Sequence, residues 1–224
     1  MMEVLFDRVP GDPVPEYGGN PRWDGLAVNF VESLDGVVAL PDAPGESGAI
    51  VSGGSKTDRF IMGLLRSCAD AVLIGAGTLR VAANDLWTAD AIFPDAKDLY
   101  ARIGKLQPPL YVVSASGNVP PPKQPAIVIK GKRTPQEILD RLRADGHRRI
   151  LCEGGPGLFS ELADAGLVDE LFLTLSPRLF GRFPNDARKA LTDRRDLRGM
   201  SLDLRSLRRD GSHLFLRYGT KSRT

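Results

Sequence analysis

One stretch of the chain limits its possible folds more than any other. Residues 149–159 read RILCEGGPGLF, an apolar run that meets two glycines and then a proline. Ile150 and Leu151 indicate a buried strand, and Pro156 favours the first position of a helix, where a missing N–H costs nothing. The two glycines before it allow the main chain to approach another group closely. The stretch therefore predicts a strand, a tight turn and a helix start, a combination typical of α/β proteins.

The predicted helix start is also a possible anion site. Free N–H groups and the positive end of the helix dipole would lie at residues 154–158, which suits a pyrophosphate. An ordinary strand-to-helix turn is the alternative, because Gly-Gly-Pro is far less specific than a full dinucleotide fingerprint. Glu153 precedes the turn at the carboxyl end of the strand, where open α/β sheets bind ligands.

Other segments repeat the alternation of strand and helix. Ser55 with Asp58, and Thr134 with Glu137, form capping patterns that predict two more helix starts. Short apolar runs typical of strands in a parallel sheet occupy residues 26–31, 71–74, 110–113, 126–129 and 171–175.

The end of the chain changes this pattern. Residues 201–207 and 213–218 read as a hairpin closed by Asp210-Gly211, whereas residues 81–107 give no clear pattern. The predicted fold class is α/β, with a mainly parallel central sheet flanked by helices and an antiparallel C-terminal hairpin at the edge.

The length of 224 residues fits one domain better than two. Residues 1–24 are rich in proline and glycine, so we expect an N-terminal arm there and a single domain over residues 25–224. The formal net charge of +2 gives no reason to expect a nucleic-acid partner. Residues 1–11 lack the apolar core of a signal peptide and no run could span a membrane, so we expect a cytoplasmic protein.

The side chains offer little chemistry of their own. The sequence contains two cysteines and two histidines, without a CxxC or a ligand spacing that would indicate a metal site, and it has no GxSxG elbow for a nucleophile. Hydride transfer requires less of the protein, because a cofactor carries the reactive atom. Glycine turns at strand ends suit a protein that binds such a cofactor.

Three separate segments resemble one known family in their order and spacing. They are residues 29–36 (NFVESLDG), residues 64–78 (LLR through GAGT) and residues 153–177 (EGGP through SP). Together they resemble the pyrimidine reductases of riboflavin biosynthesis, the C-terminal reductase domain of a bifunctional deaminase-reductase. The resemblance implies a dihydrofolate-reductase-like fold, a homodimer, and NADPH-dependent reduction of 5-amino-6-(5-phosphoribosylamino)uracil to its ribityl form. The zinc deaminase signature, HxE with PCxxC, is absent from this sequence.

The resemblance also implies a role for individual positions. The turn at residues 154–158 would receive the cofactor pyrophosphate, and the other positions would line the rest of the cofactor groove. Ser33 and Thr78 could equally be hydroxyls that cap loops. The implied cofactor residues are Ser33, Ser52, Gly75, Ala76, Thr78, Ser114, Gly154, Gly155, Pro156, Gly157 and Leu158.

Asn29 and Glu153 are the implied catalytic residues, and both would orient the substrate. Arg66 would bind the substrate's 5′-phosphate through its guanidinium fork, unless it is an ordinary exposed helix arginine. The family commonly has lysine at the position of Asn29, and an Asp-Pro pair where this chain has residues 82–85 (AAND). Candidate cations for the 2′-phosphate of NADPH lie at residues 130–133 (KGKR).

Three hypotheses follow from the sequence. The leading one is an NADPH-dependent reductase of a phosphorylated ribosylamino-pyrimidine. The second keeps the fold and cofactor but takes a pterin such as dihydrofolate, because Asn29 replaces the lysine. The third is a dinucleotide-binding protein without catalysis. It is suggested by residues 82–85, which differ from the family pattern.

Overall fold

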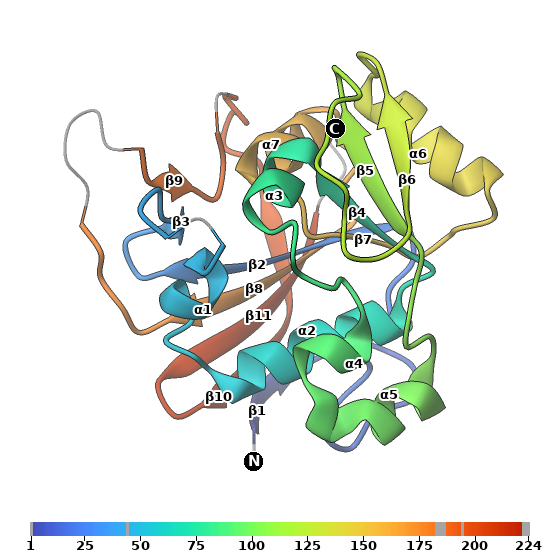
Figure 1. Cartoon of the computed structure of the whole chain (residues 1–224). Helices are drawn as coiled ribbons and strands as arrows, with labels where there is room; N and C mark the ends of the chain where they lie inside the picture. Colours follow the sequence, from blue (N-terminus) through green and yellow to red (C-terminus); the bar gives the residue numbers. More distant parts are fainter. Residues whose placement is uncertain (1, 44, 182–186, 194, 221–224) are drawn as a thin grey trace.

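The computed structural model describes residues 2–43, 45–181, 187–193 and 195–220. Most of its strands belong to one large sheet, and helices cover both faces of that sheet (Figure 1). The strands are β1 (Glu3–Asp7), β2 (Leu26–Ser33), β3 (Val37–Ala39), β4 (Ala71–Gly75), β5 (Leu110–Ser114), β6 (Ala126–Lys130), β7 (Ile150–Cys152), β8 (Glu170–Ser176), β9 (Lys189–Ala190), β10 (Leu202–Asp210) and β11 (His213–Thr220). The helices are α1 (Ser47–Val51), α2 (Lys56–Cys68), α3 (Ala76–Val81), α4 (Ala89–Ile92), the 3-10 turn η1 (Pro94–Ala96), α5 (Lys97–Ile103), α6 (Pro135–Ala144) and α7 (Pro156–Asp164).

The strand order confirms the predicted fold class. The nine-stranded sheet runs β1-β10-β11-β8-β2-β7-β4-β5-β6, and β3 pairs with β9 in a small second sheet. Strands β8, β2, β7, β4, β5 and β6 are parallel to one another, while β11, β10 and β1 are antiparallel. The carboxyl ends of the six parallel strands therefore meet at one edge of the sheet.

The C-terminal hairpin forms as expected, but β1 adds a strand beyond it. Part of the predicted N-terminal arm is thus an edge strand, paired through Glu3 with Arg209 and through Asp7 with Ser206. The arm is fixed by the buried guanidinium of Arg208, which donates to the Tyr17 carbonyl at 2.8 Å and to the Asp7 carboxylate. A buried cation needs such partners, and the arm supplies them.

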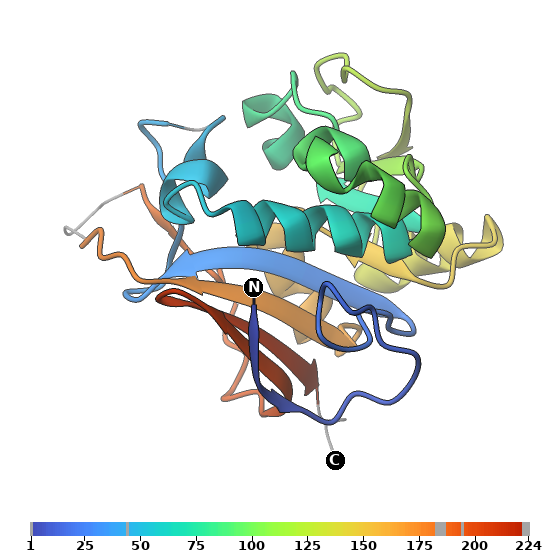
Figure 2. The ribbon, with the colours of Figure 1, turned by 90° about the horizontal axis from the view of Figure 1, so that it is seen from below.

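Each face of the sheet packs against its own helices. On one face, Ile61, Leu64 and Leu65 of α2 pack with Ala27, Leu151 and Phe172. Figure 2 shows α2 lying along β2 on this face. On the other face, α6 and α7 contribute a second cluster, which includes Leu139, Leu142, Phe159 and Leu162.

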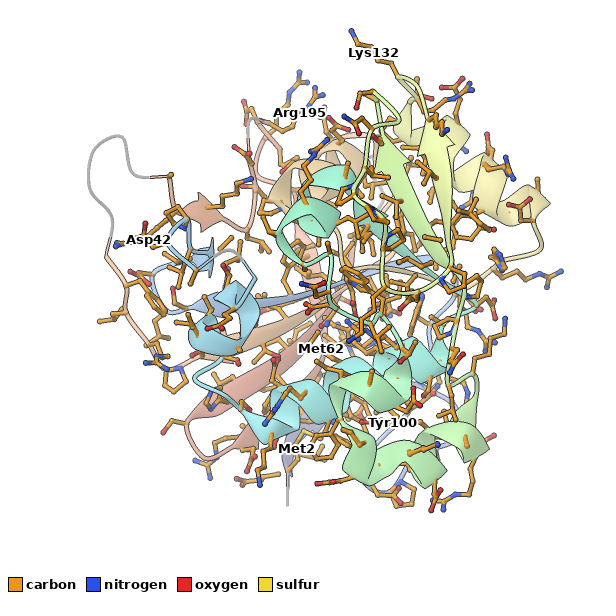
Figure 3. All side chains as sticks on the ribbon, in the orientation of Figure 1. Met2, Asp42, Met62, Tyr100, Lys132 and Arg195 are labelled. Carbon is orange, nitrogen blue, oxygen red and sulfur yellow. The ribbon has the colours of Figure 1, made fainter. Side chains whose placement is uncertain are left out.

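The sequence patterns place most of these elements correctly. Ser55 Oγ accepts a hydrogen bond from the Asp58 N–H at 3.1 Å, and Thr134 with Glu137 forms a complete capping box. The stretch that gave no pattern, residues 81–107, contains α4, η1 and α5, of which α4 and α5 pack on α2. Tyr100 of α5, labelled in Figure 3, donates to the Phe60 carbonyl of α2 at 2.8 Å. Long-range packing fixes this stretch, so a local pattern could not reveal it.

Candidate active site

A cavity of about 590 Å³ opens where α1, α2 and α3 meet the strand ends of β2 and β7. The half-buried Met62, labelled near the centre of Figure 3, lines it from α2. Because several parallel strands end here, residues far apart in the sequence share one wall. This is the position at which open α/β sheets bind ligands.

Members of all three sequence motifs line the cavity. Asn29 comes from β2, Thr78 from α3 directly after β4, and Glu153 from the turn after β7. The other predicted site residues on the wall are Ser52, Arg66, Gly155 and Pro156.

Other predicted cofactor residues do not line the cavity and have structural contacts instead. Ser33 Oγ accepts from the Val37 N–H at 2.9 Å and donates to Asp35, so it caps the β2–β3 turn. Ser114 Oγ accepts from the Gly117 N–H at 3.1 Å. The contacts of Ser33 match its loop-capping alternative, Ser114 makes a similar contact, and cofactor binding by both residues stays a prediction. The remaining residues away from the wall are Gly75, Ala76, Gly154, Gly157 and Leu158.

Gly154 is required by packing between strands. A Cβ atom there would lie 2.8 Å from the Gly75 main-chain nitrogen and 3.2 Å from the Ile74 Cα. Both are backbone atoms of the end of β4, which cannot move aside easily. The first glycine of the turn therefore lets β7 and β4 approach each other. This packing accounts for a glycine at position 154 without a ligand.

The start of α7 is partly occupied by a side chain. Thr78 Oγ1 accepts a hydrogen bond from the Gly155 N–H at 2.8 Å, and Pro156 has no N–H to offer. Within the described part of the chain, the N–H groups of Gly157 and Leu158 have no hydrogen-bond partner. Two first-turn amides thus remain for an anion at the positive end of the helix.

Arg66 and Glu153 form a buried ion pair in the cavity wall. Arg66 Nη2 lies 2.7 Å from Glu153 Oε2, and the side chains are 5% and 6% exposed. Arg66 Nε donates to the same carboxylate at 3.1 Å, while Nη1 donates to the carbonyls of Leu86 and Thr88 at 3.1 and 3.2 Å. Nε, Nη1 and Nη2 of the guanidinium therefore all donate hydrogen bonds to groups of the protein itself. As a phosphate ligand Arg66 stays a prediction, and the exposed-arginine alternative does not describe it.

The segment after α3 is held against the cavity by this same arginine. Residues 84–87 line the wall, including Asp85 and the buried Trp87. Asp85 is exposed as a residue, but partial desolvation of its carboxyl group raises its pKa, and the charges of Arg66 and Lys123 oppose that shift. Residues 82–85, which differ from the family pattern, thus lie at the cavity wall.

Sequence reasoning missed several residues of the wall. The sequence indicated Asp58 only as part of a helix cap, but the residue lines the cavity and its carboxyl group lies close to the hydroxyl of Thr174 of β8. Its position three residues after the cap, on the face of α2 that meets the sheet, was the available signal. Trp87 and Lys123 lie in segments without a pattern, so no such signal existed for them.

Two features are absent from the described residues, a membrane-spanning helix and a metal-binding cluster. None of the described helices is long and apolar enough to cross a membrane. In the same residues, no cluster of three or more His, Cys, Asp or Glu side chains is arranged to hold a metal ion.

The fold and the cavity define an α/β protein with a cavity at the carboxyl ends of its parallel strands. The chain belongs to the RibD C-terminal domain family, whose model matches residues 25–216. This is a family of NADPH-dependent pyrimidine reductases.

Individual relatives agree with this assignment. The chain is 30% identical over 189 residues to the riboflavin biosynthesis protein RibD of Mycobacterium tuberculosis, covering 80% of this chain and 50% of that protein. It is 29% identical over 161 residues to RibD of Corynebacterium ammoniagenes, covering 70% and 44%. The chain thus spans about half the length of the curated relatives it matches.

Solved structures share the fold at low sequence identity. A pyrimidine reductase-like protein from Corynebacterium diphtheriae superposes with a TM-score of 0.66 at 20% identity, covering 88% of this chain and 92% of that one. RibD from Acinetobacter baumannii gives a TM-score of 0.68 at 17% identity, covering 88% and 58%. At these identities the likeness concerns the fold alone.

Proposed function

We propose that this chain is an NADPH-dependent reductase of a phosphorylated ribosylamino-pyrimidine, 5-amino-6-(5-phosphoribosylamino)uracil, which it converts to the ribityl compound. One observation carries the proposal: Asn29, Thr78 and Glu153, from three motifs distant in sequence, line a single cavity. Membership of the RibD C-terminal domain family supports the same reaction.

The start of α7 and the neighbouring α3 suit the cofactor. The unpaired N–H groups of Gly157 and Leu158 would bind the pyrophosphate, and a Cβ built at Gly157 meets nothing within 4 Å, so the approach is open. Thr78 fixes the turn by holding the Gly155 N–H. When bound, NADPH supplies the hydride that reduces a C=N bond of the substrate.

The 2′-phosphate of NADPH needs a cation, and Lys130 is the best placed of the sequence candidates. Strand β6 pairs Lys130 with Ser114, and the Gly131 N–H donates to the Ser114 carbonyl at 3.1 Å. Lys130 also lies over the loop after β5, because a Cβ at Gly117 would be 3.1 Å from its Cδ. This loop follows the carboxyl end of β5, on the same edge as the cavity.

Glu153 and Asn29 would orient the pyrimidine. The ion pair with Arg66 holds the Glu153 carboxylate in one place, so it can accept hydrogen bonds from ring or exocyclic N–H groups. Asn29 is uncharged and can both donate and accept, which suits the edge of a heterocycle. Neither role needs a side chain to move.

The substrate phosphate would bind a cation other than the ion-paired Arg66. Besides Arg66, the described residues of the wall include two cations, Arg59 and Lys123, and both are exposed. Lys123 lies close enough to Asp85 to lower its pKa, which places the ammonium beside residues 82–85. Lys123 is therefore our first candidate for the phosphate.

The test is NADPH oxidation with the ribosylamino-pyrimidine, with and without its 5′-phosphate. We expect turnover of the phosphorylated form, and a loss of roughly tenfold in kcat/KM for Lys123→Ala, about the value of one charge-assisted contact. The matched control is Lys97→Ala on α5, outside the cavity, which should behave as wild type. Binding of NADPH without oxidation of any pyrimidine or pterin would instead support a non-catalytic dinucleotide-binding protein.

A second candidate substrate is a pterin. It is favoured by the engagement of Arg66 with Glu153, which weakens the argument for a phosphate, and by the neutral Asn29 in the wall. A dihydropterin included in the same assay decides between the two. Faster turnover of the pterin, without any effect of Lys123→Ala, would favour this second reaction.

A further inference from the structure

The cavity wall contains another buried carboxyl group, that of Asp58, whose environment differs from that of Glu153. Asp58 lies in the first turn of α2, is 5% exposed and lines the cavity. Its own N–H donates to Ser55 Oγ, and its carboxyl group lies close to the hydroxyl of Thr174 on β8. Thr174 is itself buried and sits between Val31 of β2 and Phe215 of β11. The carboxyl group is thus fixed between α2 and the sheet.

Asp58 differs from Glu153 in its partners. Glu153 is paired with Arg66, whereas no ion pair of Asp58 occurs among the described residues. His213 of β11 also acts on Asp58, but its Nε2 lies 2.8 Å from the Ser52 carbonyl oxygen, so this nitrogen is a donor to the main chain. Arg59, on the same helix, is exposed.

These surroundings favour the protonated form of Asp58. Burial raises its pKa to about 6, with a further upward effect from the negative Glu153. The Thr174 hydrogen bond and the charges of His213 and Arg59 act in the opposite direction without cancelling it. Glu153 and Asp58 therefore differ in their surroundings: Glu153 is paired with an arginine, and Asp58 can carry a proton near neutral pH.

Reduction of a C=N bond requires such a proton. Hydride addition to the carbon leaves an electron pair on the nitrogen, and the reaction is complete only when that nitrogen is protonated. The described wall offers Asp58, Asp85 and Glu153 as carboxyl groups. Glu153 is committed to Arg66, and Asp85 is exposed and lies near the charges of Arg66 and Lys123, which favour its carboxylate form.

We propose that Asp58 is the catalytic proton donor of this reductase, an inference that rests on the function proposed above. In the step, the hydride from NADPH forms the new C–H bond, the C=N π pair takes the proton from the Asp58 carboxyl group, and the N–H bond forms. The products are the secondary amine, NADP⁺ and the Asp58 carboxylate, which regains its proton from water through the open cavity. A general acid of this kind typically accelerates a reaction by about 10²–10⁴-fold.

The decisive variant is Asp58→Asn, which keeps the size and the Thr174 contact but cannot supply the proton. We expect kcat to fall about 100-fold, while NADPH affinity measured by fluorescence stays within about twofold of wild type. In wild type, kcat should be level below pH 6 and fall as pH rises above it, because the acid form is lost. This inflection should be missing in Asp58→Asn. Asp98→Asn, at the matching first turn of α5 but exposed, should keep both the rate and the inflection.

The outcomes separate this proposal from the proposed function. Wild-type turnover together with an unchanged rate in Asp58→Asn, or with a lost rate but a retained inflection, overturns the role of Asp58 alone. Equal losses of NADPH binding and turnover would also overturn it, since they indicate a structural role. Absence of wild-type turnover with every C=N substrate overturns the reductase itself.

Discussion

At the scale of single residues, the ion pair between Arg66 and Glu153 determines how the cavity can work. Both residues were predicted to contact the substrate separately, but they contact each other at 2.7 Å. The pair also fixes residues 86–88 through two carbonyls that accept from Arg66. One arginine thus positions a carboxylate and a loop at once, so removing it changes the whole wall.

Breaking this pair should destabilise the fold. We expect Arg66→Met to lower the free energy of unfolding by about 3–5 kcal/mol, because it leaves the Glu153 charge buried without a partner. The double variant Arg66→Met with Glu153→Gln should lose less than the sum of the single variants, with a coupling of roughly 1–3 kcal/mol. Urea unfolding of the four proteins measures both values. Strict additivity would contradict the interaction described here.

Because of this coupling, the turnover of an Arg66 variant does not by itself test phosphate binding. A loss of turnover in Arg66→Ala would follow from disturbance of Glu153 and residues 86–88, whether or not the arginine binds phosphate. Comparing phosphorylated and unphosphorylated substrate in the Lys123→Ala variant avoids that ambiguity, since the exposed Lys123 can be removed without leaving a buried charge.

At the scale of elements, Asp70 joins the end of α2 to the start of β7. Its Oδ2 accepts from the N–H groups of Arg148 and Arg149 at 3.1 and 2.8 Å, and its Oδ1 lies 3.1 Å from Arg149 Nη2. Burial acts to raise the pKa of Asp70, but these N–H donors outweigh it and the pKa is lowered. The carboxylate thereby stabilises the register in which β7 enters the sheet beside β4.

The contribution of Asp70 should depend on pH in a defined direction. Because its pKa is lowered on folding, the stabilisation is present above the ordinary carboxyl pKa of about 4 and is lost as pH falls through the folded value. We expect Asp70→Asn to cost about 2 kcal/mol in urea unfolding at pH 7, and progressively less below pH 4. The exposed Asp95→Asn serves as the control, with little effect at either pH. A penalty for Asp70→Asn that does not change with pH would contradict this account.

At the scale of the whole molecule, the sheet places all the candidate binding groups at one edge. Six parallel strands end there, and α7, α3 and α2 each begin or pass beside it. The predicted homodimer stays a prediction for the chain described. The described part of the predicted arm, residues 2–24, contacts the rest of the fold through β1 and Arg208.

Cofactor binding at this edge should stabilise the whole domain. At a concentration 100 times its Kd, NADPH should add roughly 2.7 kcal/mol and raise Tm by about 5–10 °C for a chain of this size. NADH at the same concentration should give a smaller shift, and Lys130→Ala should remove most of the difference between the two. Lys97→Ala provides the control. A thermal scan in which NADPH and NADH act equally on wild type would contradict the role of Lys130.

The sequence by itself determined the fold class and the order of the main strands and helices. Apolar runs, capping residues and glycine turns are local signals, because they reflect the propensities and hydrogen bonds of neighbouring residues. They were sufficient for β2, β4, β7 and the C-terminal hairpin. The same signals, combined with the family resemblance, indicated Asn29, Thr78 and Glu153 as one site.

Tertiary structure decided what each of those residues contacts. The pairing of Arg66 with Glu153, the burial of Asp58 against Thr174 and the use of Gly154 for strand packing all join segments far apart in the sequence. Burial in particular sets whether a carboxyl group keeps its proton, and burial is a property of the assembled molecule. The sequence therefore predicted where the site lies, and only the fold decided that Glu153 is paired with Arg66 while Asp58 is buried beside Thr174.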